Sequence, residues 1–297
     1  MLGTFLGSIR SEDTRIEWTL CVPAAKLWDS MQFLESPPGR VVSRVRAVYR
    51  AIRGVGPSAT LQLVRRRVAA AFGQDNRAIY EIKVPGYPHP VKIRGGNGSD
   101  GFAFYQILAM KDFDIFQDFG APRLMIDAGA NIGMSSIYFL NRYPKLKVVA
   151  IEPDPETFEI CRINLAPYSD RVVLIQGAIW SSCGRVTLVK GELEWNSHVR
   201  QAEAGADGSV EAYDVSALIA AGGGGPVDLL KVDIEGGELE LFGCNTEAWL
   251  PAVKNISIEF HGDECEKTFF RALEGYEYDG FPYRSVTICK NVRPAKR

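Results

Sequence analysis

Hydrophobic residues follow two alternating patterns along the chain from residue 124 onward. Short, nearly continuous apolar runs alternate with longer segments in which apolar residues recur at helical spacing. The runs predict strands at 124–128, 147–151, 172–176, 227–232 and 254–260. The helical segments lie at 132–142, 154–166 and near 237–242. Strands alternating with helices in this way indicate an α/β fold with a mostly parallel sheet covered on both faces.

Weaker patterns occur before and between these segments. The other expected elements are strands at 79–84, 90–94, 185–190 and 209–213, a helix at 99–116 and a hairpin near 276–289. A flexible run, AAGGGG at 220–225, precedes the fourth apolar strand. Together these elements predict a main domain over residues 79–297.

The segment before that domain, residues 1–78, predicts a helical accessory segment. Helices are expected at 24–34, 40–53 and 58–72, with Gly54, Gly56 and Pro57 ending the second of them. In the helix at 40–53, the large apolar residues fall within about 120° of the helical wheel, and the five arginines lie outside that arc. The simplest interpretation is a packed apolar stripe beneath a solvated basic face.

Charge is distributed unevenly along the chain. The formal net charge is −2, but residues 40–77 hold nine Arg and one acid, which leaves the rest of the chain near −10. The basic segment therefore permits two alternatives to a solvated face. Residues 40–72 could contact a lipid surface or an anionic substrate peripherally, or they could form a homo-oligomer contact.

Cysteine usage and hydropathy bear on the compartment. The six Cys are scattered and form no C-x-x-C pair, which favours free thiols in a reducing compartment. No apolar run reaches 18 residues, so no transmembrane segment is expected. The first residues lack a basic region followed by a long apolar core, so no signal peptide is expected. These features predict a cytoplasmic protein.

A glycine turn links the strand at 124–128 to the following helix. The turn contains Asp127, Gly129, Asn131 and Gly133, and it lies at the carboxyl end of a strand, where open α/β sheets bind ligands. Gly129 can adopt positive φ and let a ligand approach the backbone. The sequence G-A-N-I-G lacks the G-x-G-x-x-G spacing of dinucleotide sites, and no G-K-[ST] follows it. The turn therefore predicts a site without a pyrophosphate cradle.

A second polar residue suits a nucleoside. Glu152 directly follows the next apolar strand, 25 residues after Asp127, where an acid can accept hydrogen bonds from both ribose hydroxyls. Asp154 is placed to cap the following helix. A nucleoside site without a pyrophosphate cradle fits S-adenosylmethionine, whose amino-acid tail would occupy the glycine turn.

The chain resembles the FkbM-type family of class I S-adenosylmethionine-dependent methyltransferases. The resemblance rests on IDAGANIGMSS (126–136), AIEPDPETFEICRINL (150–165), DLLKVDIEGGELELF (228–242) and ISIEFH (256–261), with a weaker match in IRGGNGSDGFAFYQIL (93–108). It implies a Rossmann-like seven-stranded sheet whose last strand is antiparallel. It also implies O-methylation of a hydroxyl on a sugar, glycan or natural product. The cofactor-binding residues that follow from the turn, Glu152 and the resemblance are Asp127, Gly129, Ala130, Asn131, Gly133, Glu152, Pro153, Gly177, Ala178 and Asp100.

Charged residues at the ends of the last two parallel strands are the candidates for chemistry. Lys231 lies within an apolar strand and needs an acidic partner, either Glu259 or Asp233. Asp233 and Glu235 follow that strand, whereas Glu238 is better explained as an acid at a helix N-terminus. His261 follows the next strand and has a pKa suited to a general base. We therefore expect His261, Asp233 and Glu235 to be catalytic.

Four alternatives remain at this point. A divalent metal could bind Asp233, Glu259 and His261, although no H-x-x-x-H or EF-hand spacing supports a metal and none is favoured. The chain could bind S-adenosylmethionine without catalysis. A dinucleotide oxidoreductase is disfavoured by the turn sequence. A nucleic-acid methyltransferase is disfavoured because basic and aromatic residues do not interleave and no Asn-Pro-Pro-aromatic motif occurs.

Overall fold

The computed structural model describes residues 37–72, 78–96, 98–189, 198–201 and 208–296, with the backbone alone for 37–44 and 198–201. The chain divides into two compact units, residues 1–47 and 48–297. The described part of the first unit is the beginning of helix α2, and the helix expected at 24–34 lies outside the described residues. The division at residue 47 differs from the expected limit at residue 78, so 79–297 stays a prediction for the methyltransferase domain.

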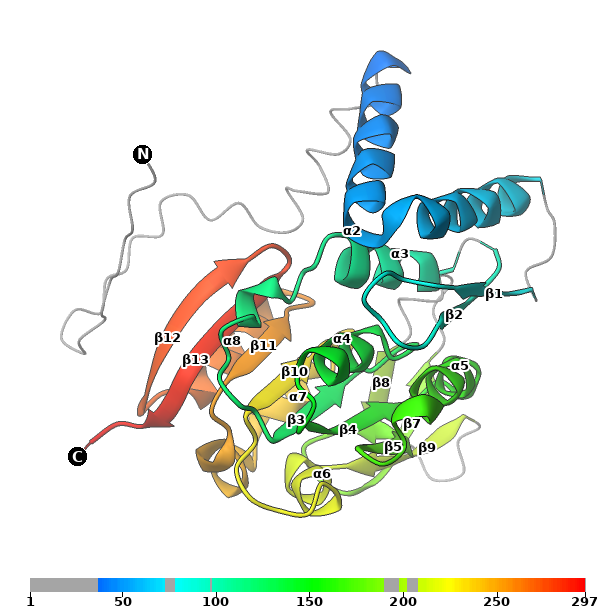
Figure 1. Cartoon of the computed structure of the whole chain (residues 1–297). Coiled ribbons are helices and arrows are strands. Elements are labelled where there is room, and N and C mark those ends of the chain that lie inside the picture. The colour runs from blue at the N-terminus through cyan, green and yellow to red at the C-terminus, as the bar shows by residue number, and fades with distance from the viewer. Residues whose placement is uncertain (1–36, 73–77, 97, 190–197, 202–207, 297) are drawn as a thin grey trace, which may run out of the picture. The chain divides into compact units, whose positions relative to one another are not determined.

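A seven-stranded sheet forms the centre of the second unit (Figure 1). Its strands, in sheet order, are β12 (Tyr276–Tyr283), β13 (Val286–Pro294), β11 (Ile256–Glu259), β10 (Leu229–Val232), β3 (Leu124–Ala128), β4 (Lys147–Glu152) and β5 (Val172–Gln176). The five strands from β11 to β5 are parallel, and β13 is antiparallel to both of its neighbours. The predicted α/β fold, with a mostly parallel sheet and an antiparallel last strand, is confirmed.

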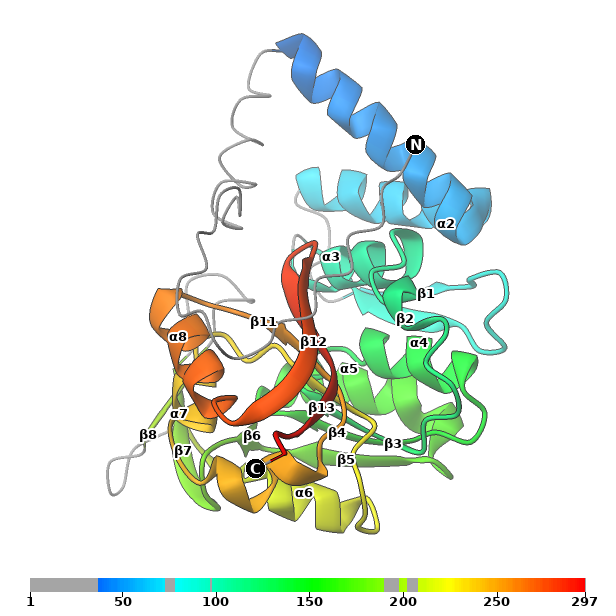
Figure 2. The same ribbon diagram turned by 90° about the vertical axis from the view of Figure 1, so that its left-hand side faces the viewer.

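Alternate residues of the central strands face two different apolar cores. Met125 and Val148 belong to one buried cluster, whereas Ile126 and Val149 belong to the other. Helices α4 (Met134–Arg142) and α5 (Pro155–Leu165) cover the first face, and α6 (Val215–Ala221), α7 (Glu238–Gly243) and α8 (Asp263–Ala272) cover the second (Figure 2). Each fully buried large apolar side chain stabilises this arrangement by about 1.5–3 kcal/mol. The polar ends of the parallel strands are thereby held on a rigid frame.

Smaller elements complete the unit. A two-stranded sheet pairs β1 (Ile79–Ile82) with β2 (Val91–Arg94), and a four-stranded sheet has the order β6-β9-β7-β8. Its strands are β6 (Ala178–Ile179), β7 (Gly184–Val189), β8 (His198–Gln201) and β9 (Ser209–Tyr213). The predicted strands at 79–84, 90–94, 185–190 and 209–213 are confirmed, whereas β6 and β8 were not predicted. Short 3-10 helices lie at Ala166–Tyr168, Thr246–Ala248 and Leu250–Ala252.

Helix α2 (Pro37–Ala71) bends at Gly56, whose φ of 82° and ψ of 166° are not helical. The bend separates the two helices predicted at 40–53 and 58–72. The predicted packing of the apolar stripe is wrong, because Val48, Tyr49 and Ile52 are exposed. The buried residues in the described part of this helix are Ala51, Val55, Ala59, Thr60 and Arg66, and the first three belong to the apolar core. Within the described residues, no helix is both long enough and apolar enough to cross a membrane.

The single helix predicted over 99–116 is wrong. Helix α3 (Asp100–Phe104) continues into a π-helical turn at Tyr105–Ala109, and a separate 3-10 helix follows at Asp114–Phe116. Lys111 adopts a φ of +56° between them and turns the chain. The turn lets Phe113 and Phe116 enter the core beside the α4 aromatic Phe139, an arrangement that a straight helix could not provide.

Candidate active site

A cavity lies at the carboxyl ends of β3, β4 and β10, opens to solvent and has about 790 Å³ of empty volume. We call it the first cavity. Its lining residues are Ser99, Gly129, Asn131, Ile151, Glu152, Pro153, Asp154, Thr157, Ala178, Ile179, Leu188, Asp233, Ile234, Glu235 and Gly237. Seven of the predicted site residues are therefore brought together here: Gly129, Asn131, Glu152, Pro153, Ala178, Asp233 and Glu235.

The turn after β3 depends on glycine and asparagine for its shape. Gly129 has a φ of +74°, and a Cβ atom there would lie 1.8 Å from the backbone oxygen of Asp233. Asn131 also has positive φ, and its side-chain Oδ1 accepts a 2.7 Å hydrogen bond from the backbone N–H of Ile132. Only a residue without a Cβ fits at Gly129, so the turn and the loop after β10 can approach each other closely.

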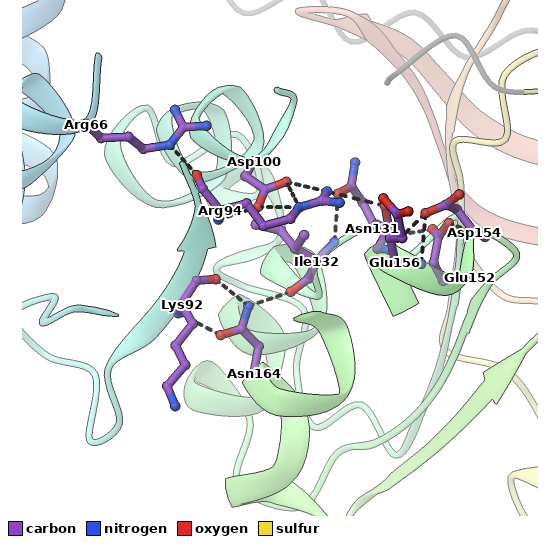
Figure 3. A network of polar contacts seen from close by, with 11 residues as sticks. Arg66, Lys92, Arg94, Asp100, Asn131, Ile132, Glu152, Asp154, Glu156 and Asn164 are labelled. Carbon is purple, nitrogen blue, oxygen red and sulfur yellow. Dashed lines mark hydrogen bonds and ion pairs between the residues drawn. The ribbon is translucent and has the colours of Figure 1, made fainter. Parts of the chain in front are cut away.

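Glu152 is the buried acid at the floor of the first cavity (Figure 3). Its Oε2 accepts a 2.9 Å hydrogen bond from the backbone N–H of Asn131, and its Oε1 accepts one of 3.0 Å from Asp154. Burial raises the pKa of Glu152 to about 7, although these backbone hydrogen bonds oppose the rise. Asp154 caps α5 through the N–H groups of Glu156 and Thr157, as its position in the sequence predicted.

Four other predicted cofactor residues lie behind the cavity wall. Ala130 and Gly177 donate backbone hydrogen bonds to Ile151 and Glu152, respectively, and so support the lining from behind. At Gly133, with a φ of +86°, a Cβ atom would lie 3.2 Å from Cys161 on α5, so glycine here permits close packing of the turn against that helix. The fourth residue, Asp127, is fully buried and does not line the first cavity.

Asp127 and Lys231 form a buried ion pair between neighbouring strands. The two residues are paired in register on β3 and β10, and Lys231 Nζ lies 3.4 Å from Asp127 Oδ1. The same ammonium lies 3.5 Å from Asp233 Oδ2 and donates a 2.6 Å hydrogen bond to the carbonyl oxygen of Gly129. Burial alone would lower the pKa of Lys231, but Asp127 and Asp233 raise it. Of the two predicted partners, Asp233 is the one within ion-pair distance, and Ser136 Oγ donates to the other oxygen of Asp127.

Asp100 belongs to a polar network beside the first cavity (Figure 3). It is fully buried, accepts a 2.7 Å hydrogen bond from the backbone N–H of Arg94, and pairs with the Arg94 guanidinium at 2.7 Å. Arg94 also donates to the hydroxyl of Thr157, which lines the cavity. Asp100 therefore lies one residue from the lining residue Ser99 and contacts the site through Arg94.

A histidine and three carboxylates gather at the ends of β10 and β11. We call Asp233, Glu235, Glu238 and His261 the histidine–carboxylate cluster. His261 Nε2 lies 3.4 Å from Glu235 Oε2 and 3.9 Å from Asp233 Oδ1, and Nδ1 lies 2.9 Å from Glu238 Oε1. Glu238 is fully buried, whereas Asp233 and Glu235 face the first cavity. The predicted catalytic residues are thus close together.

Burial and mutual charge perturb this cluster strongly. Burial raises the pKa of Glu235 to about 7. Burial alone would lower the pKa of His261, but the hydrogen bond to Glu238 and the neighbouring carboxylates raise it to about 9. At neutral pH, His261 is therefore an imidazolium when no other cation is present.

A second cavity of about 490 Å³ adjoins the first, and Asp233 lines both. Its wall combines polar residues with apolar ones, and most of its exposed surface is apolar. The polar residues include Gln106, Ser135, Lys231, Ser257, Glu259, Arg284 and Ser285, and the apolar ones are Ile107, Phe113, Val232 and Val286. Glu259 accepts a 3.3 Å hydrogen bond from Ser285 Oγ, and burial raises the pKa of Glu259 to about 7. Glu259 therefore lines the second cavity. The three side chains whose possible ligand atoms lie within 4.8 Å of one another are Asp233, Glu235 and His261, so Glu235 replaces Glu259 in the metal-ligand set suggested by the sequence.

Sequence reasoning missed several residues of the site. Glu238 was explained as a helix-terminal acid, yet its side chain orients His261. Its burial was not visible in the sequence, although an acid in the first turn of a helix beside two strand ends is a usable signal. Leu188, from β7, lines the first cavity, and no local pattern distinguishes it from other strand residues.

The sequence of the chain matches a family of known methyltransferases. The model of the methyltransferase FkbM domain family matches residues 127–276. Methyltransferase sdnD of Sordaria araneosa is 29% identical over 192 residues, which are 53% of this chain and 73% of that protein. Ribosomal RNA small subunit methyltransferase H of Rhodococcus opacus (strain B4) is 41% identical over 56 residues, which are 19% of this chain and 17% of that protein.

A solved structure of methyltransferase FkbM from Methylobacillus flagellatus KT shares 15% identity with this chain at a TM-score of 0.39. The match covers 64% of this chain and 53% of that one, so the chain spans about half the length of that protein. The family match itself includes the turn after β3, Glu152 and the histidine–carboxylate cluster. The predicted resemblance is confirmed: the chain belongs to the methyltransferase FkbM domain family, whose class I fold implies S-adenosylmethionine as the ligand.

Proposed function

We propose that the chain is an S-adenosylmethionine-dependent O-methyltransferase that acts on a hydroxyl of a sugar, a glycan or a natural product. One observation supports this most strongly. The first cavity combines Glu152 and the Gly129 turn with Asp233 and Glu235, and Asp233 also lines the second cavity. A nucleoside cofactor and an acceptor could therefore meet beside the same carboxylates.

The lining of the first cavity fits the parts of the cofactor. Glu152 can accept hydrogen bonds from ribose hydroxyls while its oxygens keep their backbone donors, because each carboxylate oxygen has two lone pairs. The apolar side chains of Ala178, Ile179 and Leu188 suit the flat face of adenine. The turn at 129–131 lies beside Asp233 and suits the amino-acid tail.

The second cavity suits an acceptor with both polar and apolar parts. Its serine, glutamine, arginine and glutamate side chains offer donors and acceptors of hydrogen bonds, while Ile107, Phe113, Val232 and Val286 offer apolar surface. This mixture supports an oxygenated natural product or a sugar that carries an apolar group. The carboxylates Asp233, Glu235 and Glu259 would repel a phosphodiester backbone, which disfavours a nucleic acid at this position.

The chemistry requires alignment and removal of one proton. S-adenosylmethionine supplies an electrophilic methyl group: its S–CH₃ bond breaks, an O–CH₃ bond forms, and S-adenosylhomocysteine leaves as a neutral thioether. Asp233 and Glu235 would hold the acceptor hydroxyl, and its proton would pass to Glu235, whose carboxylate faces His261 at 3.4 Å. Alignment can lower the barrier by about 7–11 kcal/mol, and proton removal adds about 10²–10⁴-fold in rate.

A non-catalytic cofactor-binding module is the second candidate. Such a module would need Glu152 and the Gly129 turn, but it would have no use for a buried carboxylate behind His261. The hydrogen bond between Glu238 and His261 therefore favours an enzyme.

The test is a calorimetric titration of chelator-treated protein with S-adenosylhomocysteine, with NAD⁺ and NADP⁺ as controls. We expect S-adenosylhomocysteine alone to bind, and we expect Glu152→Ala to lose that binding. Sugar and polyketide hydroxyls would then be screened as methyl acceptors. Preference for a dinucleotide, or no binding of S-adenosylhomocysteine, would contradict the proposal.

A further inference from the structure

The histidine–carboxylate cluster holds more carboxylates than the neighbouring lysine pairs with. Lys231 lies within ion-pair distance of Asp127 and Asp233 and donates to the carbonyl oxygen of Gly129, whereas Glu235 and Glu238 lie beside His261 instead. The fully buried Glu238 also has one carboxylate oxygen, Oε2, without a hydrogen-bond partner. Without a bound ion, the imidazolium of His261 supplies positive charge beside these carboxylates, and a divalent cation would take the place of that proton.

The donor atoms converge on one point. One ligand atom each from Asp233, Glu235 and His261 lies within 4.8 Å of the other two. In a metal site with bonds of about 2.0–2.2 Å, neighbouring ligand atoms lie about 3.0–3.6 Å apart. His261 Nε2 lies 3.4 Å from Glu235 Oε2 and 3.9 Å from Asp233 Oδ1. These distances are close to the ligand–ligand distances of a metal site, so little movement would be needed to bind an ion.

Glu238 fixes His261 in the orientation that a metal ligand needs. Its Oε1 accepts the hydrogen bond from Nδ1, so the lone pair of a neutral imidazole is on Nε2, which faces Asp233 and Glu235. A carboxylate behind a ligating histidine is the usual support of protein metal sites, because it sets the tautomer and raises the basicity of the ring. This contact is independent of the two half-buried carboxylates Asp233 and Glu235, and it points to a ligand at Nε2.

We propose that Asp233, Glu235 and His261 bind one divalent transition-metal ion, with Glu238 as the positioning residue behind His261. The set combines two carboxylate oxygens with one imidazole nitrogen, which suits Mn²⁺ or Zn²⁺ better than the all-oxygen preference of Mg²⁺ or Ca²⁺. It differs from the set suggested by the sequence, since Glu235 takes the place of Glu259.

The role of the ion rests on the proposed function. The three ligands lie where the first and second cavities meet, because Asp233 lines both. A cation there would lower the pKa of a hydroxyl that binds to it. The acceptor hydroxyl would then lose its proton more easily before the methyl group arrives.

The experiment measures Mn²⁺ binding by electron paramagnetic resonance in chelator-treated full-length protein without cofactor. We expect one ion per chain, at least about 100-fold weaker binding in His261→Ala, and binding about 10–100-fold weaker in Glu238→Gln. The matched control is Glu264→Gln, which makes the same charge change at an exposed residue of α8 paired with Lys267. This control should bind Mn²⁺ as the wild type does.

Calorimetry with S-adenosylhomocysteine on the same preparations separates this inference from the proposed function and also reports that the variants are folded. Binding of S-adenosylhomocysteine without Mn²⁺ binding would overturn the metal site and leave the methyltransferase standing. Binding of Mn²⁺ by a protein that does not bind S-adenosylhomocysteine would support the metal site and contradict the methyltransferase. Mn²⁺ binding that is equally strong in His261→Ala and Glu264→Gln would be adventitious and would also overturn the site.

Discussion

The two halves of the site are built by different means. Around the turn after β3, backbone shape dominates: Gly129 has a positive φ, and Glu152 is held by two backbone N–H groups. Around His261, charged side chains dominate, and they come from β10, α7 and the end of β11. The first half has a shape that accepts a ligand, and the second has a charge distribution that requires a cation or a proton.

This difference predicts that the two halves can be damaged separately. A change in the backbone of the turn should abolish cofactor binding, because no alternative conformation fits beside Asp233. A change in the charged half should leave the turn intact and alter only the events at the acceptor. The following variants test that separation.

The largest effect is expected for Gly129→Ala. The new Cβ would lie 1.8 Å from the backbone oxygen of Asp233, and the residue would keep a φ of +74°. Overpacking and the left-handed backbone together should lower the free energy of unfolding by roughly 2–5 kcal/mol and remove S-adenosylhomocysteine binding. Thermal unfolding and calorimetry measure both.

The control is Gly120→Ala, which has a similar φ of +71° but open space around the new methyl group. It should cost only about 1–2 kcal/mol and bind S-adenosylhomocysteine normally. Equal losses in the two variants would mean that the contact with Asp233 has no special importance.

His261→Ala tests the charged half. Turnover with an acceptor found by screening should fall at least about 10²-fold, because Glu235, the proposed proton acceptor, loses the partner that faces its carboxylate. The affinity for S-adenosylhomocysteine should stay near that of the wild type, since His261 does not line the first cavity. His89→Ala, in which a histidine stacked edge-on against Tyr168 is lost, is the matched control. Unchanged turnover in His261→Ala would remove this residue from the mechanism.

A smaller, pH-dependent effect is expected at Glu152. Burial raises its pKa to about 7, so the group is mostly protonated at pH 6 and mostly ionised at pH 8. Only the ionised form can accept hydrogen bonds through both oxygens, so the affinity for S-adenosylhomocysteine should rise roughly tenfold over that range. In Glu152→Gln the calorimetric affinity should be low and independent of pH.

The same shift has a definite sign for stability. The folded state holds the Glu152 proton more tightly than the unfolded state does, so this group favours folding most below about pH 4.5. That contribution is lost as the pH rises through about 7. The difference in melting temperature, Glu152→Gln minus wild type, should therefore increase between pH 5 and pH 8. A constant difference would contradict the raised pKa.

The smallest effect is expected for Thr157→Val. This change removes one acceptor for Arg94, whose guanidinium keeps its pair with Asp100. We expect the affinity for S-adenosylhomocysteine to change by less than about threefold, in line with the loss of one exposed-edge hydrogen bond. A larger loss, measured by calorimetry, would show that the Thr157 hydroxyl, which lines the first cavity, contacts the cofactor directly.

The sequence predicted the backbone half better than the charged half for a physical reason. The Gly129 turn and Glu152 are specified by residues close together in the chain, next to strands whose apolar pattern is strong. The association between Glu238 and His261 spans 23 residues and depends on how α7 packs beside β11. No local pattern contains that information, so Glu238 was explained by its place in the helix alone.

The errors in the fold have a similar origin. The helix predicted over 99–116 has helical spacing throughout, but Phe113 and Phe116 gain more from entering the core than from continuing the helix. In α2, Val48 and Ile52 belong to the predicted apolar stripe, yet they are exposed, whereas Ala51 and Val55 are buried. Tertiary packing overrides the local preference in both places.

The most direct test of the two-part site is a crystal structure of the chain with S-adenosylhomocysteine. We expect ribose hydroxyls within hydrogen-bond distance of the Glu152 carboxylate and adenine beside Ala178 and Ile179. We also expect the sulfur to face Asp233 and the second cavity. A nucleoside bound elsewhere, or a sulfur that points away from Asp233, would contradict the division into a backbone-built cofactor half and a charged catalytic half.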